Sequence, residues 1–312
     1  MQVFDARATA GALPYDRLLD RMERLFAEGV RAPVRHHHTM ARDNEPDATL
    51  LLMPAWAGTH GIVKVATVTP GNAARGLPAV TASVLVFDNV TGEHLAMLDG
   101  ATLTARRTAA AGALAARHLA RAESQTLLVV GAGRIGDELA DAFAAALPIQ
   151  RVLVWNRGEE RGRALVDKLG RAGWQAEWQA DLQAAVAQAD VISCATLATA
   201  PLVHGAWLQP GQHLDLIGAF RPDMRETDDA ALQRALLFVD TEAALKEAGE
   251  LAIPLSTGAI TTSDVAGTLY DLCGQGRRAR QANDITIFKG VGNAVMDLAA
   301  AQVALDILGD AR

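Results

Sequence analysis

The turn between residues 130 and 137 constrains the fold of this chain more than any other stretch. An apolar run, Leu127–Val130, leads into Gly131-Ala-Gly-Arg-Ile-Gly136, and an alanine- and leucine-rich helical pattern follows at once. Glycines spaced G-x-G-x-x-G between a short buried strand and a helix are typical of a dinucleotide site. The first glycine permits the tight turn, the second lets the backbone approach a pyrophosphate, and the third lets helix and strand pack closely. The predicted cofactor-binding residues of this turn are Gly131, Ala132, Gly133, Arg134, Ile135 and Gly136.

A second apolar run, Val152–Trp155, comes at the distance that a βαβ unit requires and ends in Asn156-Arg157. An NAD-binding chain normally has an acid here for the ribose 2′-hydroxyl. The missing acid and the adjacent arginine favour NADP(H), with Arg157 facing the 2′-phosphate and Arg161 or Arg163 nearby. The alternative is that these arginines are simply solvated at the start of a surface helix.

Length and composition limit the class of protein. The chain has 312 residues, half of them hydrophobic, which is ample for a large core and favours two domains. A net charge of −7 without a basic block excludes a nucleic-acid binder, and no apolar run approaches the length of a membrane span. The N-terminus lacks a signal-peptide pattern, so we expect a cytoplasmic protein. The two cysteines, Cys194 and Cys273, lack metal-ligand spacing, and neither a disulfide nor a metal site is expected.

The first hundred residues predict an antiparallel sheet with a helix. Apolar residues recur at helical spacing over residues 15–28, and turn chemistry at 88–92 separates two strand signals. The predicted strands are 49–53, 61–69, 79–87 and 95–98.

The pattern changes after residue 102. A small-residue-rich helix over 103–119 leads into the Gly131 turn, after which strands and helices alternate to residue 289, and this alternation predicts a doubly wound parallel sheet. The last helical segment has no strand after it and can pack back on the first domain. The predicted fold is therefore α/β, a Rossmann-type doubly wound sheet plus an antiparallel α+β substrate and dimerisation domain. The predicted domains are 1–115 joined by the helix 293–312, and 116–292.

Several short motifs, in this order, resemble the ornithine cyclodeaminase and mu-crystallin family through nearly the whole chain. They are Met53-Pro54, Lys64, Gly76-Leu-Pro78, Thr91-Gly92, Leu103-Thr104, Arg107-Thr-Ala-Ala110, the Gly131 turn, Arg225-Glu226, Gly249-Glu250, Thr286–Lys289, Gly292 and Asp297. The resemblance implies a Rossmann domain joined to a dimer-forming substrate domain. It also implies action on small 2-amino or 2-imino acids with a nicotinamide cofactor.

The segment Gly218–Glu226 discriminates among the family's activities. Ornithine cyclodeaminases resemble Gly-Gly-Asp-Cys-Pro-Gly-Lys-Thr-Glu here, and the aspartate handles the side-chain amine. This chain has Phe220 at that position, which cannot accept a hydrogen bond or a proton. The segment instead resembles mu-crystallin and the bacterial Δ1-pyrroline-2-carboxylate and Δ1-piperideine-2-carboxylate reductases.

We therefore predict a homodimeric cyclic ketimine reductase that uses NADPH, with NADH as the alternative cofactor. Two other hypotheses stay open. One is a different family enzyme, an ornithine cyclodeaminase or an alanine-type dehydrogenase. The other is a non-catalytic NADPH-binding protein of the mu-crystallin kind.

The resemblance implies that the catalytic residues are Arg35, Lys64 and Arg107, which would bind the substrate carboxylate. Arginine supplies a planar fork and lysine a movable charge. Lys64 lies inside an apolar strand, where an unpaired ammonium is costly.

Other positions are predicted to line the substrate or cofactor sites. Consecutive strand residues point to opposite faces, so the run His36–His38 favours a pocket residue over a metal site. Trp56 is predicted either to line the entrance of the substrate site or to fill the core. Ser193 and Thr196 follow a parallel strand, where cofactor loops or simple turns lie. The predicted substrate contacts are His38, Trp56, Phe220 and Arg221, and the further cofactor contacts are Thr108, Asn156, Arg157, Ser193, Thr196 and Gly292.

Overall fold

The computed structural model describes residues 1–276 and 280–309, and its internal contacts divide the chain into two compact units. Unit 1 comprises Met1–Arg107 together with the C-terminal segment from Asn293, and unit 2 comprises Thr108–Gly292. Helix α3 (Gly100–Leu119) contains both this division and the predicted boundary after residue 115. That boundary stays a prediction.

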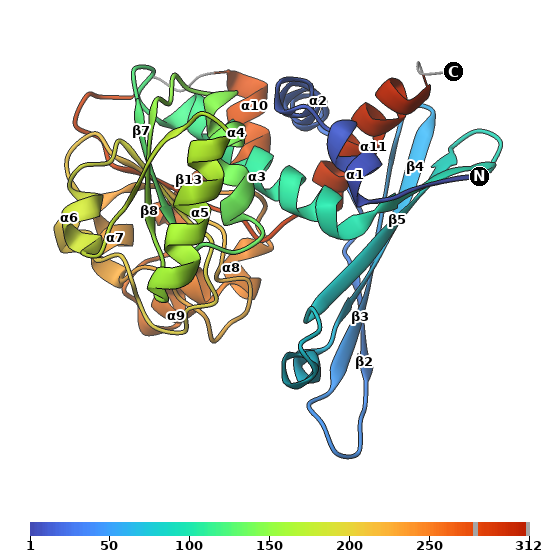
Figure 1. The fold of residues 1–312 in the computed structure, drawn as a ribbon, viewed down its shortest axis with the longest axis horizontal. Coiled ribbons are helices and arrows are strands. Elements are labelled where there is room, and N and C mark those ends of the chain that lie inside the picture. The colour runs from blue at the N-terminus through green and yellow to red at the C-terminus, as the bar shows by residue number, and fades with distance from the viewer. Residues whose placement is uncertain (277–279, 310–312) are drawn as a thin grey trace. The chain divides into compact units, whose positions relative to one another are not determined.

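Unit 1 is built on a six-stranded sheet within the described residues, in the order β1-β6-β5-β4-β3-β2 (Figure 1). Its strands are β1 (Gln2–Phe4), β2 (His36–Met40), β3 (Ala48–Ala57), β4 (His60–Val68), β5 (Val80–Asp88) and β6 (His94–Asp99). Strands β2 to β6 pair antiparallel, and the four predicted strands are confirmed. β1 pairs parallel with β6 and makes the sheet mixed, because Gln2–Phe4 is too short for its alternation to be seen in the sequence.

Unit 1 also contains the helices α1 (Ala6–Gly11), α2 (Tyr15–Ala27) and α11 (Ala294–Gly309) and the 3₁₀ helix η1 (Pro70–Arg75). α11 packs against α2, β3 and β4, which confirms that the last segment returns to the first part of the chain. Its residues are apolar on nearly every side because it is enclosed by helix and sheet. Met53, Ile62 and Val84 point from the strands into the core below it.

Unit 2 contains an eight-stranded sheet within the described residues, and its strands pair in parallel in the order β13-β12-β14-β11-β10-β7-β8-β9. The strands are β7 (Thr126–Val130), β8 (Arg151–Trp155), β9 (Gln175–Trp178), β10 (Val191–Cys194), β11 (His213–Leu216), β12 (Leu236–Val239), β13 (Val265–Thr268) and β14 (Thr286–Lys289). The helices are α4 (Gly136–Ala144), α5 (Glu159–Arg171), α6 (Leu182–Val186), α7 (Asp229–Arg234), α8 (Ala244–Glu247), α9 (Gly249–Thr257) and α10 (Leu269–Gln275), with 3₁₀ helices η2 (Gly205–Trp207) and η3 (Thr262–Asp264). The predicted doubly wound parallel sheet is confirmed, and the edge strand β13 is an addition to it.

The direction of strand order reverses at β7, whose neighbours are β8 on one side and β10 on the other. Ligands of open parallel sheets bind beyond the carboxyl ends of the strands at such a point. The Gly131 turn and the loop that contains Thr196 follow these ends. Among the helices that the structure describes, none is long and apolar enough to cross a membrane.

Candidate functional site

The glycine turn after β7 combines two crowded glycines with one open glycine. Gly131 has φ +111°, and a Cβ there would lie 2.7 Å from the carbonyl oxygen of Ala195. A Cβ on Gly136 would lie 2.1 Å from the carbonyl oxygen of Gly131, whereas one on Gly133 would meet nothing within 4 Å. The turn and packing roles predicted for the first and third glycines are thus visible in the fold. The open backbone at Gly133 suits the close approach of a pyrophosphate.

Asn156 lies beside this turn at the end of β8. Its Oδ1 accepts a hydrogen bond from the Ala132 amide at 3.0 Å, and its Nδ2 donates to the Gly158 carbonyl at 2.8 Å. Of the three candidate arginines, Arg163 is paired with Glu159 at 2.7 Å. In the described part of the chain, Arg157 and Arg161 have no acidic partner, so their charges stay available to an anion.

Thr196 and Ser193, both predicted as cofactor contacts, lie in different surroundings. The backbone nitrogen and hydroxyl of Thr196 both donate to Glu226 Oε1, at 2.7 and 2.8 Å, and its methyl group approaches the position of a Cβ on Gly131. Ser193 lies within β10, is fully buried, and donates its hydroxyl to Asp215 Oδ2 at 2.6 Å. β10 ends at Cys194, so Ser193 lies one residue before the carboxyl end of the strand, and its contact with the cofactor stays a prediction.

Thr108 and Gly292 stand at the two chain ends of unit 2. Thr108 is half-buried on α3. Gly292 has φ +85°, and its amide and that of Val291 donate to Asp240 Oδ2 at 2.7 and 2.9 Å. Burial raises the pKa of Asp240, which these amides oppose. Cofactor contact by Thr108 and Gly292 stays a prediction.

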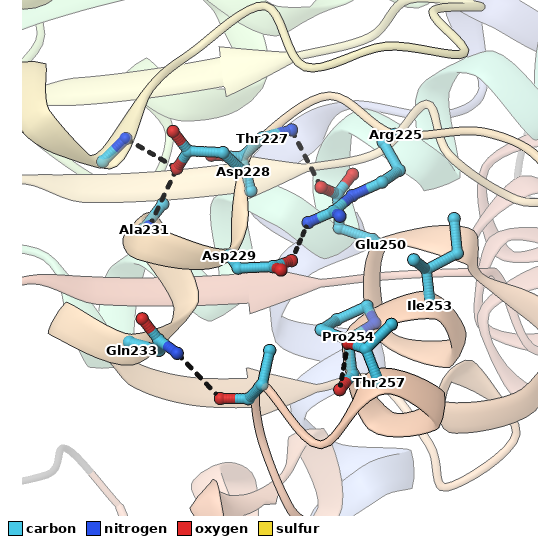
Figure 2. Close-up of polar contacts among 12 residues, drawn as sticks. Arg225, Thr227, Asp228, Asp229, Ala231, Gln233, Glu250, Ile253, Pro254 and Thr257 are labelled. Carbon is cyan, nitrogen blue, oxygen red and sulfur yellow. Dashed lines mark hydrogen bonds and ion pairs between the residues drawn. The ribbon is translucent and has the colours of Figure 1, made fainter.

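Two buried glutamates anchor the discriminating segment Gly218–Glu226. Glu226 Oε2 accepts the amide of Gly218 at 2.6 Å, while its other oxygen binds Thr196. Glu250 accepts the amides of Glu226 and Thr227, both at 2.8 Å, and Figure 2 shows the second of these bonds. Burial raises the pKa of Glu226 and raises that of Glu250 to about 7. The site prediction missed both residues, although an acid in an otherwise apolar stretch such as Gly249–Ile253 is a signal for a buried role.

The segment itself presents an aromatic ring in place of an acid. Phe220 is 43% exposed. Arg221 is exposed and forms a two-pronged ion pair with Asp223, with Nε–Oδ1 at 2.9 Å and Nη2–Oδ2 at 2.6 Å. Arg225 pairs with Asp229 at 2.6 Å and ties the end of the segment to α7 (Figure 2). The charge of Arg221 is therefore already engaged locally.

A buried charge cluster lies in unit 1. Lys64, on β4, is only 3% exposed, and its Nζ lies 2.6 Å from Asp297 Oδ2. Arg107 Nε lies 2.9 Å from Asp297 Oδ1, and Asp297 is fully buried on α11. Arg35 directly precedes β2, and it lies close enough to Lys64 for its charge to lower the pKa of that lysine. The structure thus brings the three predicted carboxylate-binding residues together and adds Asp297.

The charges in this cluster perturb one another. Burial lowers the pKa of Lys64 to about 8, although the Asp297 carboxylate raises it, and Arg107 and Arg35 lower it further. Burial would raise the pKa of Asp297, but the two adjacent cations outweigh it and lower that pKa. The two buried cations Lys64 and Arg107 around one carboxylate leave a net positive charge away from water, which is the electrostatic requirement of an anion site. The site prediction omitted Asp297, although it is the acid in an otherwise apolar helix.

His38 and Trp56 do not join this cluster within one chain. His38 pairs with Leu50 and Trp56 with Gly61, whereas Lys64 pairs with Met53. Side chains alternate along a strand, so His38 and Trp56 point away from the face that holds Lys64. Contact of His38 and Trp56 with the substrate stays a prediction. Among the described residues, no three His, Cys, Asp or Glu side chains gather as a metal site would require.

Comparisons with known proteins identify related chains. A model of the ornithine cyclodeaminase/mu-crystallin family matches residues 12–310. A Delta(1)-pyrroline-2-carboxylate reductase of Paracoccus denitrificans (strain Pd 1222) is 47% identical over 262 residues, 82% of this chain and 82% of that protein.

Two solved structures resemble both units. Thermococcus litoralis Delta(1)-pyrroline-2-carboxylate reductase in complex with NADH and L-proline has a TM-score of 0.92 and 27% identity, with 99% of this chain and 98% of that chain covered. An archaeal alanine dehydrogenase dimer with bound NAD has a TM-score of 0.88 and 28% identity over 99% and 98% of the two chains. Because the family model matches nearly the whole length of this chain, the chain belongs to the ornithine cyclodeaminase/mu-crystallin family.

Proposed function

We propose that this protein reduces cyclic ketimines with a nicotinamide cofactor, converting Δ1-pyrroline-2-carboxylate to L-proline, Δ1-piperideine-2-carboxylate to L-pipecolate, or both. The observation that supports this most directly is the buried cluster of Lys64 and Arg107 around Asp297. A net positive, desolvated site fits a small carboxylate. The relative with 47% identity is named for the reduction of such a substrate.

The cofactor would be held by residues of unit 2. The amides of the turn at Ala132 and Gly133 and the start of α4 suit a pyrophosphate, since the backbone at Gly133 is open. Asn156 and Arg157 would face the ribose. The lack of an acid there, and the Arg157 guanidinium, which has no acidic partner among the described residues, favour the 2′-phosphate of NADPH over NADH. A bound reduced nicotinamide supplies a hydride for the imine carbon.

The cationic cluster would orient the substrate. Arg107 offers a planar donor group and Lys64 a compact charge, and together with Arg35 they would bind the carboxylate next to the imine carbon. Lys64 has a pKa of about 8 and is mostly protonated at neutral pH, so it arrives at the carboxylate as a cation. Phe220 supplies apolar surface and no base, which suits a ring carbon skeleton better than a side-chain amine.

We also propose that the protein is a homodimer. The face of the unit 1 sheet opposite Lys64 is apolar, and it includes Trp56, 49% exposed, and Val65, 39% exposed. Half-buried Leu85 and Phe87 lie on the same face. An apolar sheet face of this kind is typical of a subunit interface, and a structural relative is described as a dimer.

A substrate panel tests the proposed function. Purified protein with NADPH is given Δ1-pyrroline-2-carboxylate, Δ1-piperideine-2-carboxylate, or pyruvate with ammonia, and NADPH oxidation is followed by absorbance. We expect turnover with at least one cyclic imine and none with pyruvate and ammonia. A parallel reaction with ornithine and NAD⁺ should release no ammonia, because Phe220 has no base.

Each other outcome assigns a different function. Ammonia release from ornithine would establish a cyclodeaminase, and turnover of pyruvate with ammonia alone would establish an alanine-type dehydrogenase. Tight NADPH binding without any turnover would establish a binding protein. Any of the three would overturn the ketimine reductase proposal.

A further inference from the structure

We propose that Asp297 is a positioning residue of the carboxylate site. Each of its two oxygens binds one cation, which keeps Lys64 protonated and keeps Arg107 oriented toward the substrate carboxylate. This inference rests on the proposed function for its catalytic consequence, but its physical core concerns only residues of unit 1. Asp297 itself would not touch the substrate. It would act through the two side chains that do.

The geometry separates the two oxygens of the carboxylate. Oδ2 lies 2.6 Å from Lys64 Nζ, and Oδ1 lies 2.9 Å from Arg107 Nε. Arg107 Nη1 lies 3.7 Å from the sulfur of Met296. Met296 directly precedes Asp297 on α11. A single short side chain on a packed helix therefore fixes the two cations at a set separation. Without it, two like charges in a buried place would repel and move apart.

The charge of Asp297 also matches the site to one substrate carboxylate. Lys64, Arg107 and Asp297 sum to one positive charge. A monoanion can then bind without leaving a large uncompensated charge in the core. Loss of Asp297 would remove the carboxylate that raises the pKa of Lys64 and leave the effects of Arg107 and Arg35, both of which favour its neutral form.

A purely structural role is the alternative. Asp297 lies on α11, which packs on β3 and β4, so the carboxylate could serve only to dock the helix on the sheet. Such a role predicts lower stability on substitution but no change in how activity depends on pH. The positioning role predicts a change in the protonation of Lys64. The two differ in a measurable way.

The first test measures the protonation of Lys64 directly. The chain has four lysines, Lys64, Lys168, Lys246 and Lys289, so ¹³C-lysine NMR gives few signals, and Lys64→Arg assigns the one of interest. We expect Lys64 to titrate near pH 8 in the wild type and at least about one pH unit lower in Asp297→Asn. Asp297→Glu, which keeps the charge but moves it, should keep the higher value. An unchanged or raised value in a folded Asp297→Asn protein would overturn the proposal.

The second test is the pH profile of kcat/KM for the cyclic imine. In Asp297→Asn the alkaline limb of the profile should move to lower pH, because the pKa of Lys64 falls. At neutral pH kcat/KM should fall at least about tenfold, mostly through a higher KM. Adding Lys64→Arg to Asp297→Asn should restore the alkaline limb, because arginine stays charged. A uniform loss at every pH, unaffected by Lys64→Arg, would instead establish the docking role.

Asp297→Asn could also fail to fold, and Asp297→Glu keeps the proposal open to test in that case. It should show the wild-type Lys64 titration but at least about tenfold lower imine kcat/KM, because its longer side chain displaces both cations. Full activity of Asp297→Glu would overturn the positioning role. If the wild type reduces no cyclic imine, the proposed function fails, whereas the NMR titration still decides the effect of Asp297 on Lys64.

Discussion

Lys64 and Arg107 are the residues on which the proposed activity depends most. Removing one member of a desolvated charge cluster typically costs about 2 to 5 kcal/mol, much of it from the charge left unpaired. We predict that Lys64→Ala and Arg107→Ala each lower kcat/KM for the imine by at least about a hundredfold, or about 2.7 kcal/mol. Lys64→Ala should change NADPH affinity far less, as followed by quenching of the tryptophan fluorescence. Lys246→Ala, which removes an exposed lysine, is the control. Near-wild-type turnover in Lys64→Ala would show that Lys64 does not belong to the site.

Arg157 governs the predicted choice of cofactor. Its guanidinium is exposed beside Asn156, and no acid neutralises it in the described part of the chain. We predict a higher kcat/KM with NADPH than with NADH, and a loss of about 1 to 3 kcal/mol of this preference in Arg157→Ala. Arg171→Ala, at the far end of α5, should leave the preference intact. Equal use of the two cofactors by the wild type would contradict the prediction.

The place of a single residue could be predicted from the sequence where a motif specifies the backbone. It was harder to predict where the position depends on contacts with residues far away in the sequence. The Gly131 turn follows from glycine spacing alone, and its crowded and open positions agree with that spacing. The faces of His38 and Trp56 depend on strand register, which no local pattern reveals. Asp297 becomes a site residue only because α11 returns across the sheet to Lys64, a contact far apart in sequence.

At the scale of elements, the close approach of α3 to β11 encloses a carboxyl group. Asp215 is fully buried, accepts one hydrogen bond from Ser193, and has an Oδ1 without a hydrogen-bond partner among the described residues. A Cβ on Gly112 would lie 2.5 Å from its Oδ2, so a glycine lets α3 pass the carboxyl. Burial raises the pKa of Asp215 from 3.8 to about 7, while Ser193 opposes the shift.

This buried carboxyl predicts a pH-dependent stability. Because the pKa is higher in the folded state, the stabilising contribution is complete below pH 3.8 and is lost as pH rises through about 7. Asp215→Asn cannot ionise, so its free energy of unfolding relative to the wild type should rise by about 3 kcal/mol between about pH 5 and about pH 8. Urea unfolding at several pH values measures the difference, with the exposed Asp167→Asn as control. A difference that stays constant with pH would contradict the prediction.

Most elements could be found in the sequence because their periodicity is strong. The strands of both sheets alternate or run apolar, and α2 and α5 show clear helical spacing. The exceptions include the short helix α1 and the exposed edge strand β2. They also include β1 and β13, short edge strands that are only partly buried and so leave a weak hydrophobic pattern. Their pairing is decided by the neighbouring strands β6 and β12.

For the whole molecule, the open face of the unit 1 sheet predicts the state of assembly. On the opposite face α11 packs against β3 and β4, and α2 packs against α11, whereas Trp56 and Val65 leave apolar surface exposed on the open face. Phe87 lies directly over Gly61 on this open face, where a Cβ would be 2.2 Å from its ring, so the strands present a closely packed apolar surface. Burial of such a face against a second copy stabilises in proportion to the apolar area removed from water.

We therefore predict a dimer in solution at micromolar concentration and a monomer for Val65→Glu, because a charge at the centre of an apolar interface is costly to bury. Sedimentation equilibrium measures the two masses. Val90→Glu places the same charge in the β5–β6 turn, on a residue 79% exposed, and should stay dimeric. The melting temperature of the wild type should also rise with protein concentration, since the second subunit acts as a ligand of the folded chain. A dimeric Val65→Glu protein, or a monomeric wild type, would show that this face is not the interface and that the exposed apolar strands have another partner.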